Sequence, residues 1–307
     1  MLNKLWKESE NRMMLLTYLM MFFLAGPVQA EKPYDEKLQE GIAAFYETEW
    51  DKAETIFDEL IDEKPEDPQP HFFLSMMPFW EYFFIEQSEG LADDFLERSE
   101  IAVELSEQQL EKSKSDTTMV LLLSGLHGYR SLVAAGEGNY RVAVRSGMTG
   151  FNYTRQLLSL DTDRPDARIG RGMFYYMVGS VPSELKWVTS IAGLRGDMEQ
   201  GFEELKLAAE SDSYVSSDAK MLLMYLYNKE ERYEEALKYA DELTDELPEN
   251  VIFKFKKAEI LQNNGNKEDA RELFAEISEI NNPNLPTLTK RSKKKVEELT
   301  DLTQNYY

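Results

Sequence analysis

The feature that most constrains the fold is a sparse pattern that recurs along the chain. A small residue is followed four positions later by an apolar one, and an aromatic residue or glycine comes shortly before it. Clear copies centre on Ala53, Ala236 and Ala270, and the last two are 34 positions apart. A fixed period of this length is typical of a repeat protein, in which each helical unit stacks on the next.

The small residues of the pattern have a physical purpose. Two antiparallel helices come close only where a small side chain lies at their crossing, and larger side chains fill the space around it. The positions expected at such crossings are Gly41, Ala53, Ala236 and Ala270, and Gly147 and Gly150 form a similar stripe. Pro65 and Pro248 cannot continue a helix, so each is expected to close a unit.

Residues 232–247 show what one unit looks like. Their apolar side chains follow helical steps of three and four, and acidic residues occupy the other positions. Such a one-sided helix needs a neighbour to cover its apolar face. The whole chain has 307 residues, of which 42% are hydrophobic and 30% charged, and almost nothing in it is typical of a strand. We therefore predict an all-α solenoid of antiparallel helix pairs.

The repeats resemble those of the tetratricopeptide family. The resemblance is carried by Trp50 to Pro65 with Ala53 and Phe57, and by Tyr233 to Pro248 with Ala236. It implies a scaffold whose general function is to bind other molecules.

Further motifs are similar to a group of bacterial tetratricopeptide proteins with a signal sequence. They are Phe72-Phe73, Gly138-Asn-Tyr140, Gly170-Arg-Gly172-Met-Phe-Tyr-Tyr176 and a proline-containing insertion at 177–195. This likeness implies an envelope location and attaches no reaction to any residue. We therefore predict a non-catalytic exported scaffold.

The first thirty residues differ from the rest. Three basic residues precede an apolar run over 13–24, and small residues follow, ending at Ala30. This order is typical of a secretory signal that is cleaved, here after Ala30, to leave a periplasmic or secreted protein. The apolar run is shorter than a bilayer-spanning helix needs, although a retained membrane anchor is the alternative. The predicted domains are the signal 1–30, the solenoid 31–289 and a basic capping segment 290–307.

Composition excludes several classes of function. The chain has no cysteine, which rules out disulfides, thiolate metal sites and cysteine nucleophiles. Its formal net charge is −23, so nucleic acid is an unsuitable partner. The two histidines, His71 and His127, lack the paired spacing of a helical metal site, and each is expected to be an ordinary helix residue. We predict no enzyme activity, no cofactor and no metal.

The partner is expected to be a protein or peptide bound in the concave groove that the first helix of each pair lines. The groove residues we predict are Tyr175, Tyr176, Trp187, Met221 and Tyr225. The insertion at 177–195 either leaves this groove open or fills it, and the sequence leaves both alternatives standing.

An aromatic stretch offers a second function. Between Gln69 and Glu86 charge is nearly absent, and the rings of Phe72, Phe73, Trp80 and Phe83 could line a cavity for an apolar small molecule or lipid. The alternative interpretation of this stretch is a buried core where the solenoid bends.

The C-terminal tail carries a basic cluster that includes Lys293, Lys294 and Lys295. It could make peripheral contact with anionic lipid or with an acidic partner. The alternative is a solvated helix that caps the last repeat.

Overall fold

The computed structural model describes residues 33–160, 164–181, 195–213, 215–280 and 282–304. The chain divides into two units, residues 1–37 and 38–307. Only residues 33–37 of the first unit are described, and they begin the first helix of the fold. The predicted signal 1–30 and the middle of the predicted insertion, with Trp187, lie outside the described residues.

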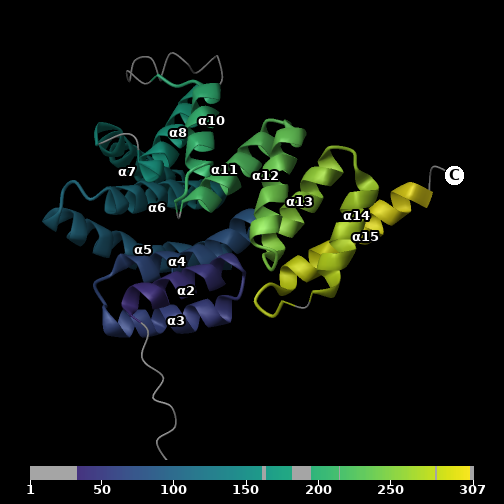
Figure 1. Ribbon diagram of the computed structural model, residues 1–307, viewed down its shortest axis with the longest axis horizontal. Helices are drawn as coiled ribbons and strands as arrows, with labels where there is room; N and C mark the ends of the chain where they lie inside the picture. Colours follow the sequence, from purple (N-terminus) through teal and green to yellow (C-terminus); the bar gives the residue numbers. More distant parts are fainter. Residues whose placement is uncertain (1–32, 161–163, 182–194, 214, 281, 305–307) are drawn as a thin grey trace, which may run out of the picture. The chain divides into compact units, whose positions relative to one another are not determined.

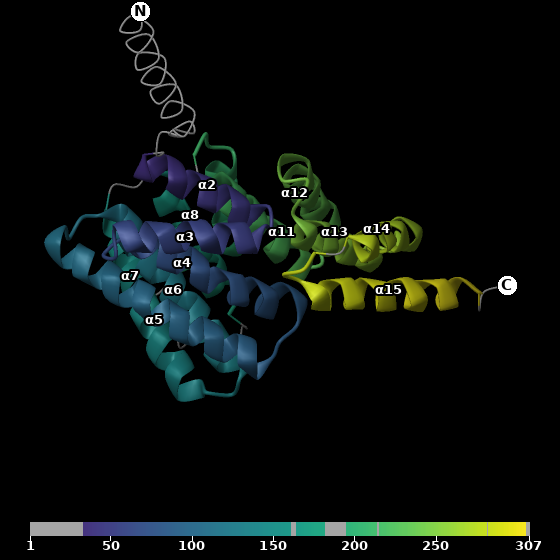
Figure 2. The same cartoon turned by 90° about the horizontal axis from the view of Figure 1, so that it is seen from below.

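The described residues contain helices and no strand, which confirms the all-α prediction. Successive helices form antiparallel pairs (Figure 1). The first pairs are α2 (Tyr34–Tyr46) with α3 (Trp50–Glu63), α4 (Pro68–Trp80) with α5 (Glu89–Lys112), and α6 (Thr117–Gly136) with α7 (Tyr140–Ser159). The later pairs are α8 (Pro165–Gly179) with α10 (Met198–Ala209), α11 (Ser216–Lys229) with α12 (Tyr233–Glu246), and α13 (Val251–Asn263) with α14 (Lys267–Glu279). A last helix, α15 (Pro286–Gln304), packs on α14 (Figure 2).

Four of the hairpins share one turn. Each has a residue with positive φ two positions before the second helix: Thr48 (58°), Gly138 (71°), Glu231 (59°) and Gly265 (88°). The amide of the following residue donates to a carbonyl five positions back, from Glu49 to Ala44, Asn139 to Ala134, Arg232 to Tyr227 and Asn266 to Leu261. This left-handed turn satisfies carbonyls at the end of the first helix. The repeat seen in the sequence is therefore also a repeat of backbone geometry.

Small residues lie at the helix crossings, as predicted. Ala53, Ala236 and Ala270 are fully buried. A Cβ at Gly41 would lie 2.7 Å from the Phe57 ring. A Cβ at Gly150 would lie 3.2 Å from the Gly128 amide nitrogen on α6. These positions allow the close approach that larger residues would prevent.

Helix α4 and its continuation carry the aromatic stretch. Most of α4 is buried, and a π-helical turn η1 (Glu81–Ile85) follows it. Pro78 lies inside the helix, where it has no amide hydrogen to donate to the preceding turn. A π turn in such a place changes which side the next rings face.

The α8–α10 pair packs through glycines. A Cβ at Gly201 would lie 2.7 Å from both the Gly172 carbonyl oxygen and the Tyr176 amide nitrogen of α8. Beside this crossing, the Glu204 carboxylate accepts from Arg168 at 2.9 Å and from Arg171 at 2.7 Å. The two arginines therefore share one acid of α10.

The turn between α2 and α3 contacts the C-terminal repeats. The Tyr46 carbonyl accepts a hydrogen bond from the Asn250 side chain, and the Thr48 carbonyl accepts one from Asn282 at 3.2 Å. Nearby, the rings of Trp80 and Phe253 lie 5.5 Å apart. These contacts join elements about two hundred positions apart, as the separation of 204 residues between Tyr46 and Asn250 shows.

None of the described helices is both long enough and apolar enough to span a bilayer.

Candidate functional site

The predicted groove residues differ in their surroundings. Met221 is buried in α11, and Tyr225 on the same helix is partly exposed, with its ring 4.9 Å from Phe83. Tyr175 is partly exposed on α8. Its neighbour Tyr176 is buried, and the Tyr176 hydroxyl donates to Glu230 at 2.6 Å. Burial, followed by the Glu230 hydrogen bond, raises the pKa of Tyr176.

These contacts divide the predicted groove residues into two groups. Tyr176 ties α8 to the end of α11, and its hydroxyl is already engaged by Glu230. Tyr225 also acts on the pKa of Tyr176, so the structure brings these two tyrosines near each other. Tyr175 and Tyr225 keep part of their surface open to solvent. The groove itself stays a prediction.

The four aromatic residues predicted to line a cavity pack against other protein rings. Phe73 lies 5.4 Å from Phe45 and is stacked at 5.6 Å on Phe57. Trp80 is 1% exposed, with Phe45 at 4.7 Å. Phe72 packs on the core of α5, α6 and α7, and Phe83 is stacked on Phe79. Protein side chains thus pack on all four rings, Trp80 is buried and the other three are partly exposed, and a ligand cavity there stays a prediction.

A carboxylate that the sequence analysis did not single out is linked to these rings through Tyr46, whose ring lies 5.7 Å from that of Trp80. Asp218, in the first turn of α11, accepts a hydrogen bond from the Tyr46 hydroxyl. Burial raises its pKa to about 6, and the Tyr46 hydrogen bond opposes that rise. No described lysine or arginine forms an ion pair with it. A carboxylate held among aromatic rings without a cation is costly to keep ionised.

The surroundings of Asp218 are shared with the predicted groove. Asp218 and Tyr225 are seven positions apart, so they occupy the same face of α11 two turns apart. The negative charge of Asp218 also raises the pKa of Tyr129 on α6, although burial of the phenol is the larger cause. The Tyr129 ring lies 4.5 Å from Phe79, which continues the aromatic row toward Phe83. No local sequence signal links Asp218 with Tyr46, because 172 residues separate them.

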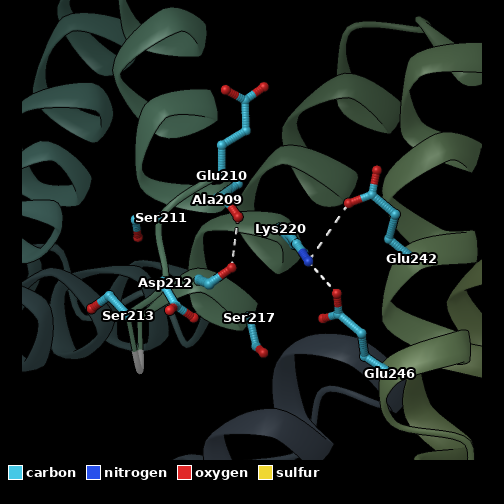
Figure 3. Close-up of a pocket in the computed structure, with 10 residues that line it drawn as sticks. Ala209, Glu210, Ser211, Asp212, Ser213, Ser217, Lys220, Glu242 and Glu246 are labelled. Atoms are coloured by element: carbon cyan, nitrogen blue, oxygen red, sulfur yellow. Dashed lines mark hydrogen bonds and ion pairs between the residues drawn. The ribbon is translucent and has the colours of Figure 1, made fainter.

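A polar hollow of about 670 Å³ opens where α10 connects to α11 (Figure 3). Serine and acidic side chains line it, and Lys220 points toward Glu242 and Glu246. The Lys220 ammonium lies 3.7 Å from the Glu242 carboxylate and also pairs with Glu246. Because its one lysine is already paired, this hollow presents a mainly acidic surface.

Neither histidine lines this hollow. His127 is stacked at 5.8 Å on Tyr153, and both of its nitrogens are buried without a hydrogen-bond partner. Burial lowers its pKa, with a smaller contribution from Arg130. Burial also lowers the pKa of His71, although Asp67 and Asp58 oppose that change. The described part of the chain has no cluster of three or more metal-ligating residues.

Part of the chain matches a known family of helical repeats. Residues 227–287 match the family model described as tetratricopeptide repeat. This C-terminal segment belongs to the tetratricopeptide repeat family. It contains α12, α13 and α14, which show the repeated turn at Glu231 and Gly265. The comparison with curated proteins gives no match.

Solved tetratricopeptide repeat structures are also similar. The protein TTC0263 of Thermus thermophilus is 16% identical, with 75% of this chain and all (100%) of that chain covered and a TM-score of 0.44. A tetratricopeptide repeat protein of Parabacteroides merdae is 14% identical, covering 89% of this chain and 92% of that chain, with a TM-score of 0.34. The P58(IPK) TPR domain is 14% identical, covering 88% of this chain and 99% of that chain, with a TM-score of 0.27.

The last described helix, α15, holds the basic cluster. Lys293 and Lys294 are exposed, and Lys294 lies 3.6 Å from Glu298. Lys295 donates to Gln262 of α13 at 3.2 Å. Arg291 donates to the Ile85 carbonyl, so this cluster also ties the last helix to η1. A peripheral contact through the lysines stays a prediction.

Proposed function

We propose that this chain is a non-catalytic scaffold that binds a protein or peptide along the first helices of its tetratricopeptide-like pairs. The observation that carries the proposal is the face of α11 that holds Asp218 and Tyr225. Both residues keep part of their surface exposed. The Phe83 ring lies 4.9 Å from the Tyr225 ring, and the Tyr46 hydroxyl donates to Asp218. A position that only packed a core would not need a carboxylate, whereas rings beside a polar group are typical of a recognition surface.

The chemistry of this face favours a partner with basic and apolar side chains. Asp218 has no cationic partner among the described residues, and Tyr225 keeps part of its surface open to a cation or to apolar groups. The formal net charge of −23 would draw a basic partner toward the protein from a distance. Tyr175 adds a further partly exposed ring on α8. The buried Tyr176 and Met221 would then hold the face in position.

The first test replaces Tyr225 with Ala. The full chain, with its predicted signal, would be expressed in its host, cross-linked in place, and its partners identified by mass spectrometry. Loss of a partly buried aromatic anchor commonly weakens binding by about tenfold or more, so one partner should be lost reproducibly. Tyr233→Ala, at a partly exposed tyrosine on α12, is the matched control and should keep that partner.

Thermal unfolding of the same variants separates binding from folding. We expect Tyr225→Ala to melt cooperatively near the parent. Loss of its cooperative transition would show that Tyr225 belongs to the core, and unchanged partner recovery would contradict the proposed face.

We further propose that the scaffold works in the bacterial envelope after export. The support is the order of basic, apolar and small residues before Ala30. Mass spectrometry of the protein isolated from its host should find Glu31 at the N-terminus. A chain that begins at Met1 and stays with the membrane would favour the retained anchor, and one that begins at Met1 in the cytoplasm would contradict export.

A further inference from the structure

The most exposed large apolar side chains of the described residues gather on three neighbouring helices. They are Leu132 (52% exposed) on α6, Tyr140 (70%), Val144 (62%) and Met148 (65%) on α7, and Met177 (60%) on α8. We call these five residues the α7 surface. Single exposed apolar residues are ordinary, but a group of them on adjacent elements marks an interaction site.

The spacing of these residues makes the surface continuous. Tyr140, Val144 and Met148 are four positions apart, so they form one row along α7. Leu132 borders this row because its neighbour Ser131 donates to the Ala143 carbonyl at 2.8 Å. On the other side α8 packs along α7 (Figure 1).

Ring contacts fix the position of α8 along that row. The rings of Phe151 and Phe174 lie 5.6 Å apart. Met177 comes three positions after Phe174 and Met148 three positions before Phe151, so each lies nearly one turn from its ring. Because the two helices run antiparallel, these methionines extend the same row of contacts.

The charge of α7 is opposite to that of the protein. Its sequence contains no Asp or Glu, and it exposes Arg141, Arg145 and Arg155. Neither Arg141 nor Arg145 forms an ion pair with a described residue. In a chain of formal net charge −23, an exposed helix that is apolar and basic is an exception.

The α7 backbone is held firmly against α6. A Cβ at Gly147 would lie 3.0 Å from the Ser131 hydroxyl, and Gly150 approaches the α6 backbone closely as well. The hydroxyls of Ser124 and Thr154 join the same two helices at 2.6 Å. A rigid surface loses little entropy when a partner docks.

We propose that the α7 surface docks an acidic amphipathic helix of a partner protein. The row of side chains at a spacing of four is the ridge along which a second helix packs, and its apolar face would cover Tyr140, Val144 and Met148. Acidic residues that flank that face would pair with Arg141 and Arg145. The opposite charge of the two surfaces would select such a helix over a basic one.

An anionic membrane is the other surface that basic and apolar side chains could meet. The formal net charge of −23 opposes it, because the whole protein would be repelled as it approached. A single acidic helix presents far less charged surface than a bilayer does, so the net charge of the protein repels it less. The observations therefore favour a helical protein partner.

The test measures binding of a designed helical peptide to the chain that begins at Glu31. The probe is a fluorescent amphipathic helix of about 20 residues, with leucines on one face and glutamates on the other, followed by anisotropy. Val144→Ser with Met148→Ser should weaken binding by about tenfold or more, because the apolar contact is lost. Arg141→Ser with Arg145→Ser should also weaken it and should reduce its dependence on salt.

The matched control is Ile101→Ser with Leu207→Ser, which removes two exposed apolar side chains from α5 and α10. This pair, and Tyr225→Ala, should bind the peptide like the parent. Equal binding of the Val144 and Met148 variant would overturn the proposal. So would equal binding of a peptide in which lysines replace the glutamates. Binding to phosphatidylserine vesicles without binding to the peptide would instead make this surface a membrane contact and overturn it as well.

Discussion

The C-terminal repeats and the α8–α10 pair bring two helices together through different side chains. In α12 and α14 the crossing positions are Ala236 and Ala270, both fully buried. At the α8–α10 crossing the corresponding close approach is made by Gly172 and Gly201. Glycine lets the central helices come closer than alanine would allow, at the cost of helix propensity. The same fold is thus reached with a tighter crossing in the centre.

The outer faces of the two regions differ as well. Helix α12 exposes Glu234, Asp241 and Asp245, and this solvated acidic face needs no partner. Helix α7 exposes an apolar row and arginines. Both helices bury small residues, Ala236 and Ala240 in α12 and Ala143 and Gly150 in α7, so this contrast lies in the side chains of their outer faces. The repeat therefore sets the fold, and the outer side chains distinguish one helix from another.

The largest expected effect would show how far the two crossings differ. Gly201→Ala places a Cβ 2.7 Å from backbone atoms of α8, which must then move. We expect a loss of about 2 to 3 kcal/mol in the free energy of unfolding. The reverse change in the C-terminal repeats, Ala236→Gly, should cost about 1 kcal/mol through helix propensity. Urea unfolding of both variants measures this difference.

The control for the central region is Gly128→Ala. Nothing lies within 4 Å of a Cβ at Gly128, so this variant should gain up to about 1 kcal/mol. If Gly201→Ala proved as harmless as Gly128→Ala, the central crossing would be no tighter than the C-terminal ones.

The next prediction compares the stability effects of two acidic residues, Asp218 between the helices and Asp245 on the exposed side of α12. The pKa of Asp218 is raised from 3.8 to about 6 on folding, so the folded state favours its protonated form. The protonated carboxyl therefore contributes to the free energy of unfolding below about pH 4, and this contribution is lost as the pH rises through about 6. Asp218→Asn removes the cost of ionisation and leaves an oxygen for Tyr46. It should therefore gain up to about 3 kcal/mol at pH 7 and little at pH 4.

Asp245→Asn, at an exposed position of α12, is the matched change. It should alter stability by less than about 0.5 kcal/mol at either pH. Unfolding curves at the two pH values measure both variants. A gain for Asp218→Asn that did not depend on pH would show that its carboxylate is not held in a costly site.

The smallest effect would test whether the turns of both regions are equivalent. Glu231 adopts a φ of 59° in the C-terminal region, where glycine is less strained. Glu231→Gly should therefore gain up to about 1 kcal/mol, whereas Gly138→Ala in the central region should lose about as much. Thermal melts of the two variants show the sign. A loss on Glu231→Gly would mean that its side chain stabilises the turn by more than the strain it carries.

Much of the fold could be predicted because it follows from local spacing. The small residues at Gly41, Ala53, Ala236 and Ala270 lie at crossings as expected, since no larger side chain would fit there. The positive φ of Thr48 and Glu231 was not predictable, because neither residue is typical of that conformation. The shared turn imposes it on them.

Less of the candidate site could be predicted. Tyr175 and Tyr176 are adjacent, and nothing in their sequence shows that one is partly exposed and the other buried. The row of Tyr140, Val144 and Met148 has the spacing of an ordinary core stripe. Whether a neighbour covers such a stripe depends on how the pairs stack.

The sequence by itself determined the helix pairs and their acidic character, because small residues, prolines and periodicity act within a few turns of the chain. Only the tertiary structure decided that Tyr46 reaches Asp218 and that Asn250 caps α13 while holding the first turn. No described element covers the α7 surface, and this too follows from the tertiary structure. Each of these depends on the angles at which successive pairs stack, and small differences in side-chain volume at every crossing add up over the whole chain.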